Sequence, residues 1–121
     1  MRLRAILKSK IHRATVTGAR LDYVGSIAID EELLEKSDIR PGELVHVWNV
    51  NNGERIETYA LPAPPGSGSV VLNGAAARRF CVQDVIIVAA FCLTDETVSP
   101  RVLLVDEKNA FVRYLTDNHP D

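Results

Sequence analysis

Short runs of apolar and β-branched residues, most of them bounded by turn residues, recur along this chain of 121 residues. Several of them alternate with polar residues at the two-residue period of a strand. Residues 85–93 are all apolar, which predicts a strand that is fully buried. The chain is therefore predicted to be mostly β, with extended segments at residues 2–17, 44–48, 55–61, 70–72, 85–93, 101–105 and 110–114.

Two short helices and several turns separate these strands. Residues 30–36 have the pattern of a helix, with Asp30 as its N-cap and acidic residues in its first turn, and residues 74–78 open a second one. Asn51-Asn52-Gly53 predicts a hairpin, because Asn and Gly accept the positive φ of tight turns. Pro41-Gly42 is a further turn, residues 62–69 form a Pro/Gly/Ser loop, and residues 117–121 are expected to fray.

Two segments of the chain echo each other weakly. Glu43 and Asp84 each stand directly before an apolar strand, and each follows a predicted short helix and a turn. This hints at two related halves, as in a pseudo-symmetric barrel. The pattern alone therefore favours a small β-barrel with short helices.

Length, composition and charge narrow the class of protein. A chain of 121 residues forms one domain with a single core, and its 46% apolar and 25% charged residues are ordinary for a soluble globular protein. The formal net charge is −2, with acids and bases mixed along the chain. These values argue against nucleic acid or an anionic membrane as the main partner.

Neither the expected cellular location nor the two cysteines indicate a particular reaction. No apolar run is long enough for a secretory signal or for a bilayer crossing, so we expect a cytoplasmic protein with no membrane partner. Cys81 and Cys92 provide no disulfide framework and no metal-ligand spacing. Both stand among apolar residues, which predicts two buried free thiols.

The segment Tyr23-Val24-Gly25-Ser26 carries the most informative candidate chemistry. In self-cleavage, a serine hydroxyl attacks the preceding carbonyl and the acyl group moves from nitrogen to oxygen. Elimination from the ester and hydrolysis of the resulting dehydroalanine then leave a pyruvoyl group at a new N-terminus. A glycine before the serine helps, because it can hold a strained backbone and leaves its carbonyl approachable. The alternative is a plain turn with a solvated serine.

A pyruvoyl group supplies what amino-acid decarboxylation requires. Loss of CO2 leaves electrons on the α-carbon that no natural side chain can accept, whereas a ketone can form a Schiff base with the substrate amine and delocalise them. No lysine in the sequence lies in a recognisable pyridoxal-phosphate context. A sink made from the chain itself is the simpler account.

Four segments together carry a family resemblance: residues 10–13, 23–26, 48–59 and 73–77. In this order they resemble the pyruvoyl-dependent aspartate decarboxylases, carboxy-lyases that convert L-aspartate to β-alanine for pantothenate and coenzyme A synthesis. The likeness covers roughly residues 1–115.

The resemblance implies a fold, an assembly and a maturation. The expected fold is a double-psi β-barrel with short helices, assembled as a homotetramer. An inactive precursor, one domain of residues 1–121, would be cleaved into a β-chain of residues 1–25 and an α-chain of residues 26–121. Ser26 would become the pyruvoyl cofactor, and no metal, pyridoxal phosphate or nucleotide is implied. The sequence leaves open whether a maturation factor accelerates cleavage.

Substrate recognition is expected from basic residues. Arg55 offers a guanidinium fork that suits a carboxylate. A cation on the departing α-carboxylate would stabilise the ground state, so Arg55 is assigned to the retained β-carboxylate. The resemblance implies that Lys10 orients substrate and cofactor by charge and that His12 supports the site. The alternatives are a solvated Arg55 and a structural His12.

The remaining site residues are implied mainly by the resemblance. Thr58 would bind the oxyanion during cleavage, and Tyr59 would be the proton donor to the decarboxylated carbon. Asn73 would hydrogen-bond the cleavage site or the pyruvoyl carbonyls. The small residues that would admit substrate to the backbone are Gly74, Ala75 and Ala76. Tyr23 and Trp48 would line or support the pocket, although aromatic residues at such positions are commonly core.

The sequence departs from the family pattern at two points, and two other functions stay open. Residues 78–81 are more basic than expected, and Gln83 stands where the family often has glycine.

The first alternative function is a related pyruvoyl enzyme that acts on glutamate. Its substrate has one methylene more than aspartate, a difference worth only about 1–3 kcal/mol in a pocket. A non-enzymatic β-barrel interaction module would keep Gly25-Ser26 as a turn and never split.

Overall fold

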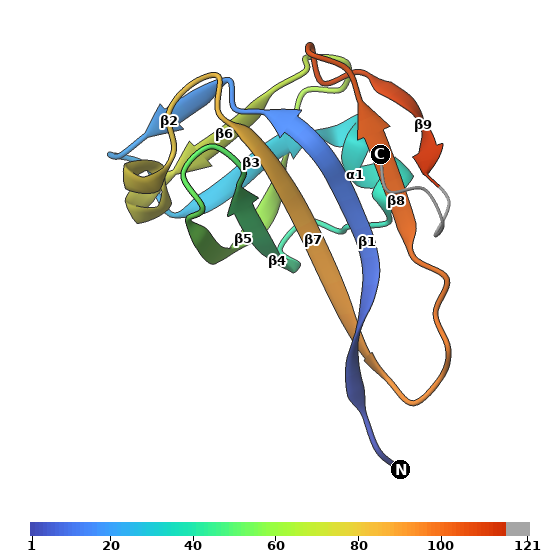
Figure 1. Ribbon diagram of the computed structural model, residues 1–121. Coiled ribbons are helices and arrows are strands. Elements are labelled where there is room, and N and C mark those ends of the chain that lie inside the picture. The colour runs from blue at the N-terminus through green and yellow to red at the C-terminus, as the bar shows by residue number, and fades with distance from the viewer. Residues whose placement is uncertain (116–121) are drawn as a thin grey trace.

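The computed structural model describes residues 1–115, which form one mixed β-sheet with two short helices (Figure 1). The strand order across the sheet is β2-β6-β3-β5-β4-β7-β1-β8-β9. The elements in chain order are β1 (Arg4–Thr15), β2 (Gly18–Arg20), β3 (Ser26–Asp30), α1 (Glu31–Ser37), β4 (Leu44–Asn49), β5 (Arg55–Ala63), β6 (Val70–Asn73), the 3₁₀ helix η1 (Gly74–Arg79), β7 (Val85–Thr94), β8 (Arg101–Val105) and β9 (Phe111–Leu115).

The sheet is strongly curved around one apolar core. Strand pairs β1–β8, β2–β6 and β3–β5 are parallel, whereas β1–β7, β4–β5 and β4–β7 are antiparallel. Ile11, Ile27, Val47, Val88 and Leu103 are fully buried in one cluster, so strands from both halves of the strand order share the same interior. The predicted class, a mainly β double-psi barrel with short helices, is confirmed. Neither helix within residues 1–115 has the length and apolar composition that a bilayer crossing needs.

The two segments that echo each other in sequence make the same turn. The backbone N–H of Glu43 donates to the carbonyl of Arg40 at 3.0 Å, and its carboxylate accepts the N–H of Arg40 at 3.0 Å. Asp84 repeats both bonds with Cys81, at 3.0 and 2.9 Å. An acid that closes its own turn therefore begins a strand in each half of the barrel.

The similarity of the two turns extends to the backbone hydrogen bonds that each makes with a neighbouring segment. Gly42 donates to the carbonyl of Ala60 at 2.7 Å, and the N–H of Ala60 donates to the carbonyl of Glu43 at 3.0 Å. In the other half, Gln83 donates to the carbonyl of Val16 at 2.8 Å, and Val16 donates back to the carbonyl of Asp84 at 2.9 Å. Gly42 and Gln83 occupy equivalent places, with φ of +87° and +83°.

Gln83→Gly is expected to stabilise the fold. A non-glycine residue at this φ is strained by roughly 1–2 kcal/mol, and the greater freedom of glycine in the unfolded chain offsets about 0.5–1 kcal/mol of that. Thermal unfolding should therefore show a net gain of about 0.5–1 kcal/mol. The matched control is Gly42→Ala, whose Cβ would meet no atom within 4 Å, so its expected loss comes from backbone strain alone. A less stable Gln83→Gly variant would contradict the argument.

Helix α1 is capped at both ends by the residues next to it, and its N-cap also binds a distant loop. Asp30 is the N-cap, as predicted, and its carboxylate accepts N–H groups from Glu32 at 2.9 Å, Gly66 at 3.0 Å and Gly68 at 2.8 Å. At the other end, Asp38 is the C-cap with φ of 57°.

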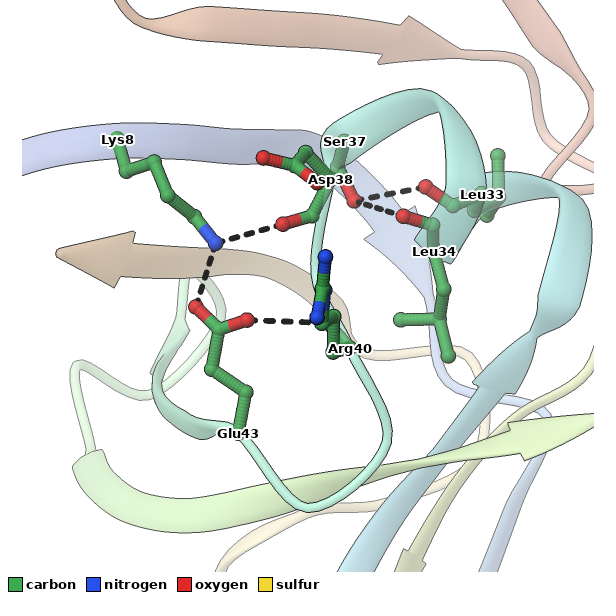
Figure 2. A network of polar contacts seen from close by, with 7 residues as sticks. All are labelled: Lys8, Leu33, Leu34, Ser37, Asp38, Arg40 and Glu43. Atoms are coloured by element: carbon green, nitrogen blue, oxygen red, sulfur yellow. Dashed lines mark hydrogen bonds and ion pairs between the residues drawn. The ribbon is translucent and has the colours of Figure 1, made fainter. Parts of the chain in front are cut away.

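The C-terminal end of α1 belongs to a polar network (Figure 2). Lys8 of β1 donates to the carbonyl of Asp38 at 2.6 Å and to the carboxylate of Glu43 at 2.6 Å. Ser37 donates back to the carbonyl of Leu33 at 2.7 Å, inside the last turn of the helix. One lysine thus ties together β1, the end of α1 and the turn before β4.

Three sequence predictions about the strands need correction. Strands β2 and β3 were not predicted, because each is short and β3 begins at a Gly-Ser pair that has the composition of a turn. Strand β5 continues through Pro62 to Ala63, so the loop begins at residue 64 rather than 62. Pro62 is accommodated because it lies beyond Ala60, where pairing with β4 ends and only the parallel pairing with β3 continues.

Strand β7 and the cysteines are less buried than the sequence indicated. The prediction of full burial is correct for Ile86 and for residues 88–90, whereas Ile87 is half-buried. Phe91 and Leu93 are exposed, because β1 and β7 project past the core as a two-stranded arm (Figure 1). The prediction of two buried thiols is wrong: Cys81 is exposed, since it lies in the turn before β7, and Cys92 is half-buried in the arm. The expected fraying of residues 117–121 lies outside the described residues.

Candidate active site

Ser26 lies where an exposed loop enters the core. It is the first residue of β3 and only 1% exposed, whereas Val24 is 83% exposed. Tyr23 is also exposed, and the guanidinium of Arg20 lies 5.1 Å from its ring centroid. The Gly25–Ser26 peptide bond therefore has an open approach on its N-terminal side and a fixed, buried side chain on its C-terminal side.

The Ser26 hydroxyl is held by Asn73. The two residues are directly opposite in the antiparallel pair β3–β6, and Asn73 Nδ2 donates to Ser26 Oγ at 3.0 Å. Ser26 Oγ lies 3.5 Å from the carbonyl oxygen of Val24, toward which its own proton can point. Asn73 Oδ1 is buried and has no hydrogen-bond partner among residues 1–115. The amide thus orients the hydroxyl and keeps one acceptor unused beside it.

Gly74 packs directly against the backbone of Gly25. A Cβ on Gly74 would lie 2.8 Å from the Cα of Gly25, 2.9 Å from its nitrogen and 3.0 Å from the carbonyl oxygen of Tyr23. Gly74 also has a φ of +72°, which side chains disfavour. A Cβ on Gly25, in contrast, would meet no atom within 4 Å, and the φ of Gly25 is not in the left-handed range. The glycine that this geometry requires is therefore Gly74, and the strained backbone expected at Gly25 is not observed.

Thr58 and Tyr59 reach the same region from the neighbouring strand. The parallel pair β3–β5 aligns Ile27 with Ala60, so the same register extended by one residue places Ser26 beside Tyr59. Adjacent strands are about 4.8 Å apart. Thr58 is half-buried and Tyr59 is 36% exposed, as expected for side chains on opposite faces. Ala75 and Ala76 follow in η1, the first exposed and the second half-buried.

Arg55 lies at the other end of β5, over an aromatic ring. Its guanidinium carbon is 4.4 Å from the ring centroid of Trp48, to which it is also paired in register. The two residues line a shallow hollow of about 390 Å³ together with Ile56, Glu57 and His46. A carboxylate entering this hollow would meet a guanidinium already ordered by stacking.

His46 was not identified from the sequence. Its Nε2 lies 3.6 Å from a carboxylate oxygen of Glu57, and its ring meets Phe91 edge-on with the centroids 5.2 Å apart. Its position between two apolar residues of a predicted strand was the available signal, because a titratable side chain there must face outward.

Lys10 and His12 lie on β1, away from Ser26. Lys10 is aligned with Ala89 of β7, and Ala89 is aligned with His46 of β4. Lys10 is therefore three strand spacings, about 14 Å, from β5. Arg55 precedes Tyr59 by four residues, about 13 Å along the strand.

One chain thus assembles two groups of predicted residues rather than one. The cleavage group contains Gly25, Ser26, Thr58, Tyr59, Asn73 and Gly74. The cationic group contains Arg55 with Trp48, and, farther across the sheet, Lys10 and His12. Within residues 1–115, no three His, Cys, Asp or Glu side chains are grouped as metal ligands.

Comparison with known proteins identifies relatives of the chain. The profile of a family described as aspartate decarboxylase matches residues 1–112. A protein of Carboxydothermus hydrogenoformans named aspartate 1-decarboxylase is 54% identical over 112 residues, which are 89% of this chain and 88% of the relative. Proteins of the same name from Desulfitobacterium hafniense and Listeria monocytogenes are 57% and 53% identical over 110 residues, covering 88% of this chain and 87% of each relative.

Proposed function

The chain belongs to the aspartate decarboxylase family, and from this premise we propose that it converts L-aspartate to β-alanine and CO2 with a pyruvoyl group made from its own Ser26. The resemblance read from the sequence is confirmed at the level of the family. The observation that carries the proposal is the buried Ser26 hydroxyl, which accepts a hydrogen bond from Asn73 at a peptide bond held by Gly74.

The residues around Ser26 fit a pyruvoyl group. Such a group carries two adjacent carbonyls and no side-chain hydroxyl, so it needs donors and little room. Asn73 Nδ2 already donates at this place, and Gly74 offers backbone without a Cβ. The unused acceptor Asn73 Oδ1 indicates that the intact chain does not satisfy every polar atom of the site.

Self-cleavage would use side chains of the chain and one water molecule. Ser26 Oγ attacks the carbonyl carbon of Gly25, and the peptide nitrogen leaves as the new ester forms. Thr58 is assigned to the oxyanion of that carbonyl. Elimination then breaks the ester, giving residues 1–25 with a free carboxylate and residues 26–121 with a dehydroalanine start. One water enters and one ammonia leaves as that start becomes the pyruvoyl group.

In the mature enzyme, the other site residues would bind the substrate, orient it and supply a proton. The pyruvoyl group supplies an electron sink for the bond to the departing carboxylate. Arg55 binds the retained β-carboxylate, ordered by its stacking on Trp48. Lys10 orients the substrate, which carries two carboxylates, by charge. Tyr59 holds the proton that the α-carbon gains after CO2 has left.

The separation of the two groups of residues supports the proposed homotetramer. Measured along the sheet within one chain, Arg55 lies about 13 Å from Tyr59, and Lys10 lies four strand spacings, about 19 Å, from the strand that begins at Ser26. Both distances are too long for a single small substrate. A second copy could bring its cationic face against the cleavage group. Exposed apolar residues around this face, including Leu44, Phe91 and Leu93, would be covered by such an assembly. Each site would then draw residues from two chains.

The intact mass of the purified protein tests the proposal. We expect two fragments, one ending at Gly25 and one starting at residue 26 that is lighter by one ammonia than a serine start. The same preparation should release β-alanine and CO2 from L-aspartate without added cofactor. A single mass that persists after prolonged warming, with and without cell extract, would overturn the proposal. Cleavage that appears only with extract would indicate a maturation factor.

A further inference from the structure

The hairpin between β4 and β5 holds the C-terminal end of η1. Asn52 Nδ2 donates to the carbonyl of Arg79 at 3.0 Å, and Asn49 Nδ2 donates to the same oxygen at 3.2 Å. The guanidinium of Arg79 forms an ion pair with the carboxylate of Glu54. Three side chains of one hairpin therefore contact one residue of the helix.

The N-terminal end of the same helix adjoins the cleavage site. Asn73, which binds Ser26, directly precedes η1, and Gly74 at its first position packs on the backbone of Gly25. The six residues of this 3₁₀ helix extend about 12 Å, so one short element joins Arg79 to the residues beside Ser26.

We propose that Glu54, Asn52 and Arg79 are positioning residues for self-cleavage: the contact of the hairpin with Arg79 sets the place of η1, and so of Asn73 and Gly74, at the Gly25–Ser26 bond. This rests on the proposed function. Intramolecular attack needs the hydroxyl and the carbonyl in a near-attack arrangement, and a small displacement lowers the rate steeply.

The ion pair of Arg79 with Glu54 is exposed, so its effect on the rate of self-cleavage can be measured apart from any effect on stability. The side chains of Arg79 and Glu54 are 55% and 40% exposed, and exposed ion pairs contribute little to stability. Neither residue belongs to the cleavage group. A slower cleavage reaction in a chain of unchanged stability would thus report position rather than unfolding.

A reciprocal charge exchange tests the proposal through the rate of self-cleavage. Arg79→Glu and Glu54→Arg are each expected to slow cleavage about tenfold, because each places like charges at the contact. The double variant, with the charges exchanged, should cleave at close to the unmodified rate. Arg78→Glu makes the same charge change at the adjacent exposed residue and should cleave normally. Cleavage is followed by intact mass at a temperature where every variant is folded.

Two further measurements distinguish slower cleavage from lower stability. Thermal unfolding of each variant combined with Ser26→Ala reports stability without cleavage, and unchanged midpoints are expected. Asn52→Ala removes one donor to Arg79 without changing charge and should also slow cleavage. Single variants that cleave at the unmodified rate, or a double variant as slow as its parents, would overturn the positioning role alone. An unmodified chain that never cleaves would overturn the proposed function, and this role with it.

Discussion

Ser26→Ala should give a folded chain that never splits and never decarboxylates aspartate. Alanine removes the hydroxyl that is proposed to attack the Gly25 carbonyl, and with it the proposed source of the pyruvoyl group. The loss also leaves the buried Nδ2 of Asn73 without its acceptor, which costs about 1–3 kcal/mol of stability. Intact mass should show one species of full length, and β-alanine should not form.

Ser67→Ala is the matched control for this variant. Gly66-Ser67 is the same dipeptide as Gly25-Ser26, but it lies in the exposed loop between β5 and β6. Within residues 1–115, its hydroxyl accepts one local hydrogen bond, from the backbone N–H of Ser69 at 3.2 Å. We expect Ser67→Ala to cleave and turn over normally. Two fragments from the Ser26→Ala chain, or loss of cleavage in Ser67→Ala, would contradict the assignment of Ser26.

Gly74→Ala is expected to stop or nearly stop cleavage in a chain that is also less stable. The added Cβ would stand 2.8 Å from Gly25 Cα, and the backbone at Gly74 has a φ of +72°. Strain and overpacking together suggest a loss of about 2–4 kcal/mol. The Gly25 backbone must move to relieve the contact, which should slow cleavage by about 100-fold or more. Thermal unfolding and a time course of intact mass measure the two effects.

Gly25→Ala distinguishes this contact from a general need for glycine beside Ser26. A Cβ at Gly25 meets no atom within 4 Å, so the variant should unfold at nearly the unmodified temperature. The sequence argument placed the required glycine at Gly25, and the structure places it at Gly74. If Gly74→Ala were as stable and as rapidly cleaved as the unmodified chain, the close packing would not govern the site.

Local patterns predicted most of the barrel. The hairpin at residues 51–53, the N-cap at Asp30 and the strand at residues 101–105 follow from interactions within a few residues, and all three are present. Gly53 alone of the three hairpin residues adopts a positive φ, so glycine is what this turn requires. Strand β3 could not be predicted in the same way, because its burial comes from β5 and β6 on either side.

The geometry of the candidate site depends on residues that are far apart in sequence. Asn73 meets Ser26 across 47 residues, and no spacing rule relates the two. The family resemblance predicted a hydrogen bond from Asn73 to the cleavage site, but it did not predict the strand pairing that places Asn73 opposite Ser26. It also gathered Lys10 and Arg55 into one site with Ser26, whereas the strand order and register place both cations away from Ser26 within one chain. In the proposal these residues meet Ser26 only when two copies of the chain assemble, and no local pattern in one sequence predicts that contact.

The place of β1 in the sheet governs how a cleaved molecule would behave. Strand β1 lies between β7 and β8, pairs with both, and contributes the fully buried Ile11. After a break at Gly25–Ser26, residues 1–25 would remain as a separate peptide inserted in the middle of the sheet. Denaturation would then release two molecules, so renaturation becomes a second-order reaction that slows on dilution. Maturation would thus convert a chain that folds by itself into a complex whose recovery depends on concentration.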